Sequence, residues 1–336
     1  MGNEGIKKHY LRDEPQWLVK PNNRLKRPLI VQLGFAEHPS TTTLGEELRE
    51  QDHNVYVNAH PKKESDAFLK TELEQAQIKA RELYARRIAS GEVDAVLLET
   101  LLARIPLALF REARALILLM EEVMDVNEPA AVAGHSFGAQ AAIVAAFLRP
   151  DLYPNQNKTQ STLVLLNPAG FTGKREAASP VVSASEKVRD THINIKQKRF
   201  VETMEDLSRA GELQVRYFCS VVATALFRGA EGKKAFGDSV RYSVANLLNG
   251  RIDREARDMA NTDIVPFANF LTEINGLRIV VVYDARDTTF PARIIEERQG
   301  EMPGVEFQKT SGKGHFGPVH DPKGTAGVIG KILKDR

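Results

Sequence analysis

The segment 131–140, AVAGHSFGAQ, constrains the fold of this chain more than any other stretch. An apolar run ends in GHSFG, and the alanine-rich segment AQAAIVAAFL follows directly. This pattern predicts a buried strand, a sharp turn with Ser136 at its apex, and a helix that starts at once. Gly134 and Gly138 fit such a turn because a side chain at either position would meet backbone. The motif G-x-S-x-G in this context predicts a serine nucleophile raised above a sheet edge.

Apolar runs of strand length recur along the chain and alternate with helical patterns. The runs occupy residues 28–33, 55–58, 130–133, 161–167, 277–283 and 305–309. Helices are expected over 43–51, over 64–89, as two helices within 93–126, over 139–148, near 291–299 and over 322–334. Pro106 is expected to separate the two helices of 93–126, and Asp321 to cap the last helix. The alternation predicts an α/β protein with a mostly parallel central sheet flanked by helices.

The stretch 171–270 interrupts this alternation, because it has helical patterns and no strand signal. It leaves and re-enters the sheet at strand ends, where sheets of this kind bind ligands. We therefore expect a core of residues 1–170 and 271–336 with a helical cap inserted over 171–270. A separate helical domain is the alternative. The helix-rich segment 64–126 is longer than the core needs. The sequence leaves open whether the additional helices serve packing or dimerisation.

A serine hydroxyl becomes an effective nucleophile when a base lies within hydrogen-bonding reach and an acid orients that base. On a parallel sheet with this turn, the acid and then the histidine are expected on loops after later strands. The loop DARDTTFP follows one late strand and contains Asp284 and Asp287; the loop TSGKGHFG follows the next and contains His315. The spacing to proline favours Asp287 as the acid, with Asp284 as the alternative acid or a turn-capping residue.

Two further histidines compete with His315 for the role of base. His320 lies at the start of the last helix, a position that favours a surface or capping role. His135 lies inside the turn and is expected to pack or to hydrogen-bond locally. Both patterns leave His315 as the expected base.

These three motifs together resemble the serine hydrolases of the α/β-hydrolase fold that carry a helical cap before the acid-bearing strand. The resemblance covers the organisation of residues 28–336 and is specific in GHSFG, in DARDTTFP and in GKGHFG. The second motif is similar to the family's G-x-x-D-x-x-x-P loop, with Asp284 in place of the usual glycine, and the third to its G-G-H-F loop. The resemblance implies Ser136 as nucleophile, Asp287 as acid, and His315 as general base and acid.

The same chemistry needs an oxyanion hole made of two backbone N–H groups. One is expected at Phe137, directly after the nucleophile. The resemblance implies that Phe35 supplies the second, because Gly34-Phe35 is similar to the family's His-Gly-x element. Leu33 occupies the position at which that element usually has histidine. The chain therefore lacks one of the residues by which the element is recognised.

The composition of the chain argues against several other classes of protein. A net charge of +2 on 336 residues argues against a nucleic-acid surface. The single cysteine, Cys219, excludes an internal disulfide and fits a reducing compartment. The sequence has no run of 18 apolar residues and no signal-like start, so we expect a cytoplasmic protein without a membrane partner. No metal site and no organic cofactor are predicted.

The sequence thus predicts a serine hydrolase that cleaves a small or medium, apolar carboxylic ester through an acyl-enzyme. The same triad would also serve amide, thioester or carbon–carbon bond hydrolysis, or perhydrolysis. Serine at the apex of the turn disfavours dehalogenase or epoxide hydrolase chemistry, which uses aspartate there. A binding protein that keeps the pocket without turnover is the alternative from another class.

Overall fold

The computed structural model of the chain describes residues 6–11, 14–19, 28–34, 42–51, 53–58, 64–124, 130–154, 160–171, 262–287, 290, 292–312, 314–315 and 317–334. The predicted core falls largely within these residues. Most of the predicted cap, residues 172–261, lies outside them, and so does Phe35.

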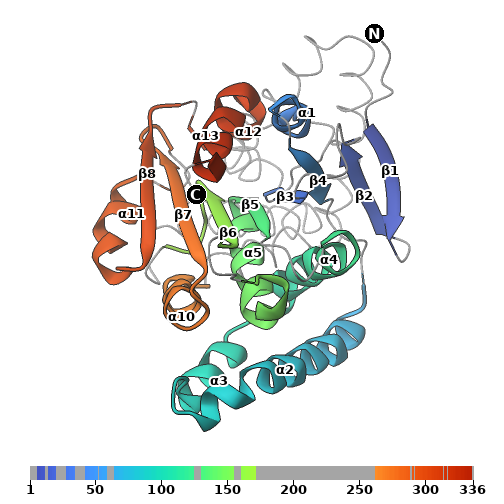
Figure 1. The fold of residues 1–336 in the computed structure, drawn as a ribbon, viewed down its shortest axis with the longest axis vertical. Coiled ribbons are helices and arrows are strands. Elements are labelled where there is room, and N and C mark those ends of the chain that lie inside the picture. The colour runs from blue at the N-terminus through green and yellow to red at the C-terminus, as the bar shows by residue number, and fades with distance from the viewer. Residues whose placement is uncertain are drawn as a thin grey trace, which may run out of the picture.

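A single eight-stranded sheet crosses the described part of the chain in the order β1-β2-β4-β3-β5-β6-β7-β8 (Figure 1). The strands are β1 Ile6–Leu11, β2 Glu14–Val19, β3 Pro28–Gln32, β4 Asn54–Asn58, β5 Ala131–His135, β6 Thr162–Leu166, β7 Arg278–Asp284 and β8 Val305–Thr310. All neighbouring pairs from β4 to β8 are parallel. The predicted mostly parallel sheet is therefore confirmed.

The β1–β2 hairpin at the sheet edge differs from the prediction, which places no strand before residue 28. β1 and β2 pair antiparallel, and β2 joins the sheet antiparallel to β4. Their sequences, IKKHYL and EPQWLV, contain too few regularly alternating apolar residues to give a strand signal. These two segments form strands because they pair with each other and with the edge of the sheet, and such pairing leaves no periodic pattern in the local sequence.

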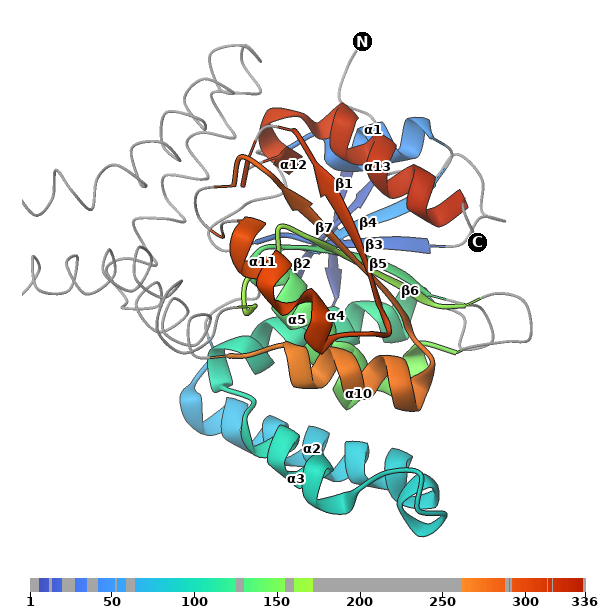
Figure 2. The same cartoon turned by 90° about the vertical axis from the view of Figure 1, so that its left-hand side faces the viewer.

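Helices cover both faces of the sheet (Figure 2). On one face lie α1 Leu44–Glu50, the short α12 Gly317–His320 and α13 Pro322–Lys334. Leu48 of α1 and Ile329 and Ile332 of α13 pack there with apolar side chains of the strands. Asp321 accepts a hydrogen bond from the Gly324 N–H at 3.0 Å, which confirms its predicted capping of the last helix.

The opposite face carries a thicker layer (Figures 1 and 2). It contains α4 Leu107–Val123, α5 Phe137–Leu148, α10 Val265–Asn275 and α11 Ala292–Arg298, with the single turns η2 Pro150–Leu152 and η3 Gln299–Glu301. The hairpin of α2 Asp66–Ala89 and α3 Ala95–Ala103 forms an outer layer over α4 and α5. Every residue of α5 is buried, because the helix is enclosed between the sheet and these outer helices.

The helix α4 begins after Pro106, as predicted, because proline is tolerated at a helix start and not in a helix interior. None of the helices in the described ranges is both long enough and apolar enough to cross a lipid bilayer.

The two ends of the segment 172–261 are held together where they meet the core. The Ile264 N–H donates to the Gly170 carbonyl at 3.0 Å. The Arg298 guanidinium of α11 binds the Phe171 carbonyl at 3.1 Å and both carboxylate oxygens of Asp263, at 2.9 and 3.0 Å. The predicted cap boundary at residue 270 falls inside α10, which packs against α5.

Candidate active site

Ser136 lies at the junction of β5 and α5, at the carboxyl edge of the parallel strands. Its backbone has φ 53° and ψ −118°, a conformation that costs an L-residue on the order of 1–3 kcal/mol. Three hydrogen bonds hold the turn: the Ser136 N–H donates to the Leu166 carbonyl at 3.0 Å, and the Ser136 carbonyl accepts from the N–H groups of Ala139 and Ala169 at 3.1 and 3.2 Å. The neighbouring strand β6 and the helix α5 thus impose the strained geometry.

The two glycines of the motif lie where backbone approaches backbone. A Cβ at Gly134 would be 2.7 Å from the Ala139 Cα. A Cβ at Gly138 would come within 2.5 Å of the Gln32 carbonyl oxygen and closer still to that of Leu33. These distances are shorter than any real Cβ contact, so only glycine allows α5 to start this close to β3 and β5.

The loops after β7 and β8 place two more of the predicted site residues beside Ser136. The His315 Nε2 lies 3.0 Å from the Ser136 Oγ, and the His315 Nδ1 lies 2.8 Å from the Asp287 Oδ2. All three side chains are buried. Because a carboxylate accepts, Nδ1 carries the proton and leaves the Nε2 lone pair directed at the serine hydroxyl. The arrangement can take a proton from Ser136.

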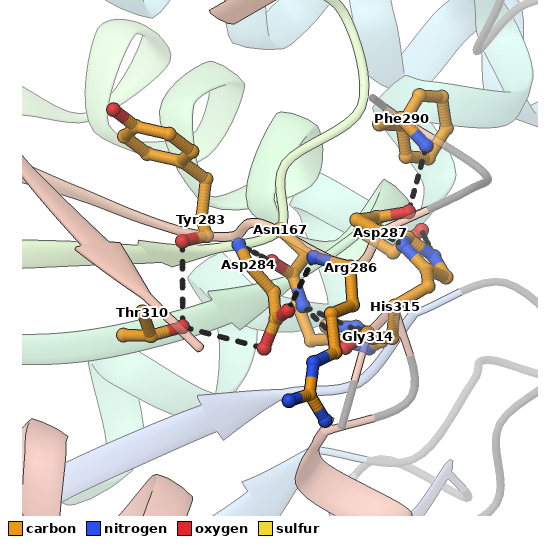
Figure 3. Close-up of polar contacts among 11 residues, drawn as sticks. Asn167, Tyr283, Asp284, Arg286, Asp287, Phe290, Thr310, Gly314 and His315 are labelled. Carbon is orange, nitrogen blue, oxygen red and sulfur yellow. Dashed lines mark hydrogen bonds and ion pairs between the residues drawn. The ribbon is translucent and has the colours of Figure 1, made fainter. Parts of the chain in front are cut away.

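Phe290 supports both members of the acid–histidine pair (Figure 3). Its N–H donates to the Asp287 Oδ1 at 2.8 Å, which leaves Oδ2 for the histidine. Its ring lies edge-on to the His315 imidazole with the ring centroids 5.1 Å apart. Neither contact is foreseen from the sequence, because each depends on how the loop folds back after Asp287.

The alternative acid, Asp284, has other partners. Its Oδ1 accepts from the Arg286 N–H at 2.7 Å, and its Oδ2 lies 3.4 Å from the Thr310 Oγ1 (Figure 3). The first of these bonds is the turn-capping interaction considered as its other role. The structure therefore places Asp287, and not Asp284, at the histidine.

Of the two residues expected to supply oxyanion-hole N–H groups, only Phe137 is described. It is the first residue of α5, directly after Ser136, and an N–H at this position has no partner within its own helix. Phe35 lies outside the described residues; in the sequence it follows Gly34, two residues after the end of the β3 strand. The side chain of the competing histidine, His320, is also outside them.

Comparison with solved structures places this geometry in a known fold. An N-formylmaleamic acid deformylase from Pseudomonas putida matches with a TM-score of 0.53 and 16% identity over 96% of this chain and 99% of that one. The chain has the α/β-hydrolase fold. An α/β hydrolase from a Medee basin deep-sea metagenome library matches at 0.53 and 12% identity, over 98% and 97% of the two chains. An esterase from a Rhodococcus species matches at 0.52 and 14% identity, over 98% and 99%.

The sequence itself matches no protein-family model and no curated protein. The similarity to these solved structures is therefore one of fold. It confirms the fold expected from the sequence.

Two polar residues missing from the expected site, Asn167 and His135, contact the loop that holds His315. Asn167 directly follows the β6 strand and donates to the carbonyls of Gly314 and His315. His135, which is expected to interact only locally, contacts the His315 carbonyl at 2.7 Å. An asparagine directly after an apolar strand is the only signal in the sequence that singles out Asn167, and it does not identify a partner 148 residues away.

Proposed function

We propose that this protein is a serine hydrolase that cleaves a small or medium, apolar carboxylic ester through an acyl-enzyme. The observation that carries the proposal is the position of His315, whose two ring nitrogens bridge the Ser136 Oγ and the Asp287 carboxylate. A hydrogen-bonded serine, histidine and carboxylate in this order is the arrangement that nucleophilic acyl transfer requires.

In the first half of the reaction the His315 Nε2 takes the hydroxyl proton as the Ser136 Oγ attacks the ester carbonyl carbon. The tetrahedral intermediate collapses when His315 returns this proton to the departing alcohol oxygen, which breaks the carbon–oxygen bond and leaves an acyl-serine. Asp287 stabilises the transient imidazolium through Nδ1. In the second half a water molecule gives a proton to His315 and attacks the acyl carbon, and Ser136 leaves with that proton.

The developing oxyanion needs donors that are already oriented, since their reorganisation would add to the barrier. The Phe137 N–H at the start of α5 is our first donor, and the positive end of the helix dipole favours negative charge there. Phe35 is proposed as the second. Removal of one such donor typically costs about 10²–10³ in turnover number.

The comparisons support hydrolysis at a carbonyl without selecting the bond. The structures with this fold include one named as an esterase and one named as a deformylase. Nothing in the triad distinguishes an ester from an amide or a thioester, so the ester rests on the sequence-based prediction. We also propose a cytoplasmic location and a small-molecule substrate, and dimerisation stays an open role of the segment 64–126.

Labelling with a fluorophosphonate probe tests the proposal, because the probe reacts covalently with an activated serine. The wild type is expected to be labelled and Ser136→Ala not. Ser90→Ala, at the exposed C-terminal end of α2, is the matched control and should label like the wild type. An unlabelled wild type, or equal labelling of Ser136→Ala, would overturn the acyl-enzyme and favour a binding protein. A panel of matched p-nitrophenyl esters, anilides and thioesters then ranks the bond types.

A further inference from the structure

The main-chain carbonyl of His315 accepts hydrogen bonds from two side chains outside its own loop. His135 Nε2 lies 2.7 Å from this oxygen and Asn167 Nδ2 lies 3.2 Å from it. We infer that His135 and Asn167 are positioning residues, which set the place of the general base by holding its main chain. The inference rests on the proposed function, in which His315 is that base.

His135 connects the base to the nucleophile's own strand. It is the last residue of β5, it directly precedes Ser136, and its side chain is 1% exposed. Since a carbonyl oxygen can only accept, the contact requires a proton on the His135 Nε2. The same backbone that bends into the Ser136 turn therefore carries a donor to the backbone of His315, and nucleophile and base share one rigid support.

Asn167, the residue after β6, connects the loop of His315 to β7 (Figure 3). Its backbone has φ 41°, a left-handed conformation that asparagine adopts more readily than most residues, and its N–H donates to the Val282 carbonyl at 2.7 Å. Its Oδ1 accepts from the Asp284 N–H at 2.8 Å, while its Nδ2 also donates to the Gly314 carbonyl at 3.1 Å. The side-chain amide of Asn167 is thus hydrogen-bonded both to the end of β7 and to the loop that carries His315.

After β8 ends at Thr310, the chain passes through Gly312 and Gly314 before His315, and Gly314 has φ 76°. A cavity of about 240 Å³ adjoins the loop and is lined by Gly312, Gly314, Asp284 and Thr325 among others. The two glycines have no side chains that could anchor the loop, so the hydrogen bonds to the carbonyls of Gly314 and His315 restrain its main chain. A misplacement of the base by 1 Å would cost on the order of 10²-fold in rate.

A matched pair of substitutions at His135 separates the hydrogen bond from the packing. Glutamine and methionine have nearly the same length and volume, but only glutamine carries a donor near the position of the histidine Nε2. We expect His135→Met to lower kcat for a p-nitrophenyl ester by about 10²-fold, with KM little changed because His135 is not expected to touch substrate. His135→Gln is expected to recover at least about tenfold of that loss, since the donor is restored.

The outcomes separate this inference from the proposed function. A wild type that the fluorophosphonate probe does not label would overturn the proposed function and the inference with it. A labelled wild type with equal kcat in His135→Met and His135→Gln, or with wild-type kcat in His135→Met, would overturn the positioning role alone. If His135→Met does not fold, kcat of the Asn167→Asp variant tests the positioning role instead. This variant keeps the acceptor for the Asp284 N–H and loses the donor, so lowered kcat supports the inference and unchanged kcat overturns it.

Discussion

The backbone N–H of Asp284 donates to the side-chain Oδ1 of Asn167 at 2.8 Å, which joins the end of β7 to the end of β6. The Asp284 carboxylate meanwhile caps the Arg286 N–H and lies near Thr310. Asp287, later in the same turn, directs its Oδ2 at the His315 Nδ1. Two buried aspartates three residues apart therefore have separate partners, and this difference allows a test of which one is the acid.

Asp287→Asn should lower kcat for a p-nitrophenyl ester by about 10³–10⁴-fold, because an amide cannot orient the histidine tautomer that accepts the serine proton. Asp284→Asn should keep kcat within about tenfold and lower the free energy of unfolding by about 1 kcal/mol, since it weakens a cap. Steady-state kinetics and urea unfolding of both variants give the comparison. A larger loss of kcat in Asp284→Asn than in Asp287→Asn would reverse the assignment.

Gly138→Ala should destabilise the fold by about 3 kcal/mol or more, because the added Cβ would be pressed against the carbonyls of Leu33 and Gln32. The control is Gly327→Ala on the exposed side of α13, where a Cβ meets nothing within 4 Å. That change should stabilise the protein by about 0.5–1 kcal/mol, because alanine favours a helix over glycine. Urea denaturation measures both, and a neutral Gly138→Ala would contradict the described approach of α5 to β3.

Arg298→Met should lower the free energy of unfolding by about 1.5–3 kcal/mol, because it removes charged hydrogen bonds to Phe171 and Asp263 where the two ends of segment 172–261 meet the core. The control, Arg293→Met on the same helix, removes an exposed ion pair to Glu297 and should cost less than about 0.5 kcal/mol. Equal unfolding midpoints for the two variants would rule out a structural role for the Arg298 contacts.

The Arg278–Glu306 pair between β7 and β8 should make stability depend on acid pH. Two hydrogen bonds of 2.7 and 2.9 Å from the Arg278 guanidinium, with its charge, hold the pKa of Glu306 below its usual 4.5. Because the unfolded chain then binds this proton more readily, the stabilisation is full above about pH 4.5 and is lost as the pH falls below it. The Glu306 side chain is 54% exposed, so the contribution is about 0.2–1 kcal/mol.

Urea unfolding of the wild type and Glu306→Gln over this pH range measures that contribution. The difference between them should be present at about pH 7 and should shrink below pH 4.5. In an Arg278→Met background the difference should be small at every pH, because the partner that lowers the pKa is gone. A constant difference in the wild-type background would show that Glu306 does not take part in acid destabilisation.

Local sequence was enough to predict most of the parallel sheet and its helices. The longer elements between residues 28 and 166 and those after 277 follow from apolar runs and helical periodicity, because the spacing of apolar side chains indicates which face is buried. The short helix α12 and the single turns η2 and η3 were not predicted. The hairpin at 6–19 was missed, since an edge pairing rather than an apolar pattern stabilises it. The predicted cap over 171–270 stays a prediction, as does the catalytic role of each site residue.

The strand–turn–helix around Ser136 is readable from the sequence itself. The steric demand for Gly134 arises within this one segment, where a Cβ would meet Ala139, whereas the demand for Gly138 comes from the carbonyls of Gln32 and Leu33. The order of a late aspartate and a later histidine is likewise readable along the chain. Only the tertiary structure decides that His315 meets Asp287 rather than Asp284, and that Asn167 and His135 hold the histidine's main chain. Those contacts join ends of different parallel strands, so they depend on strand register and loop path, which no local pattern contains.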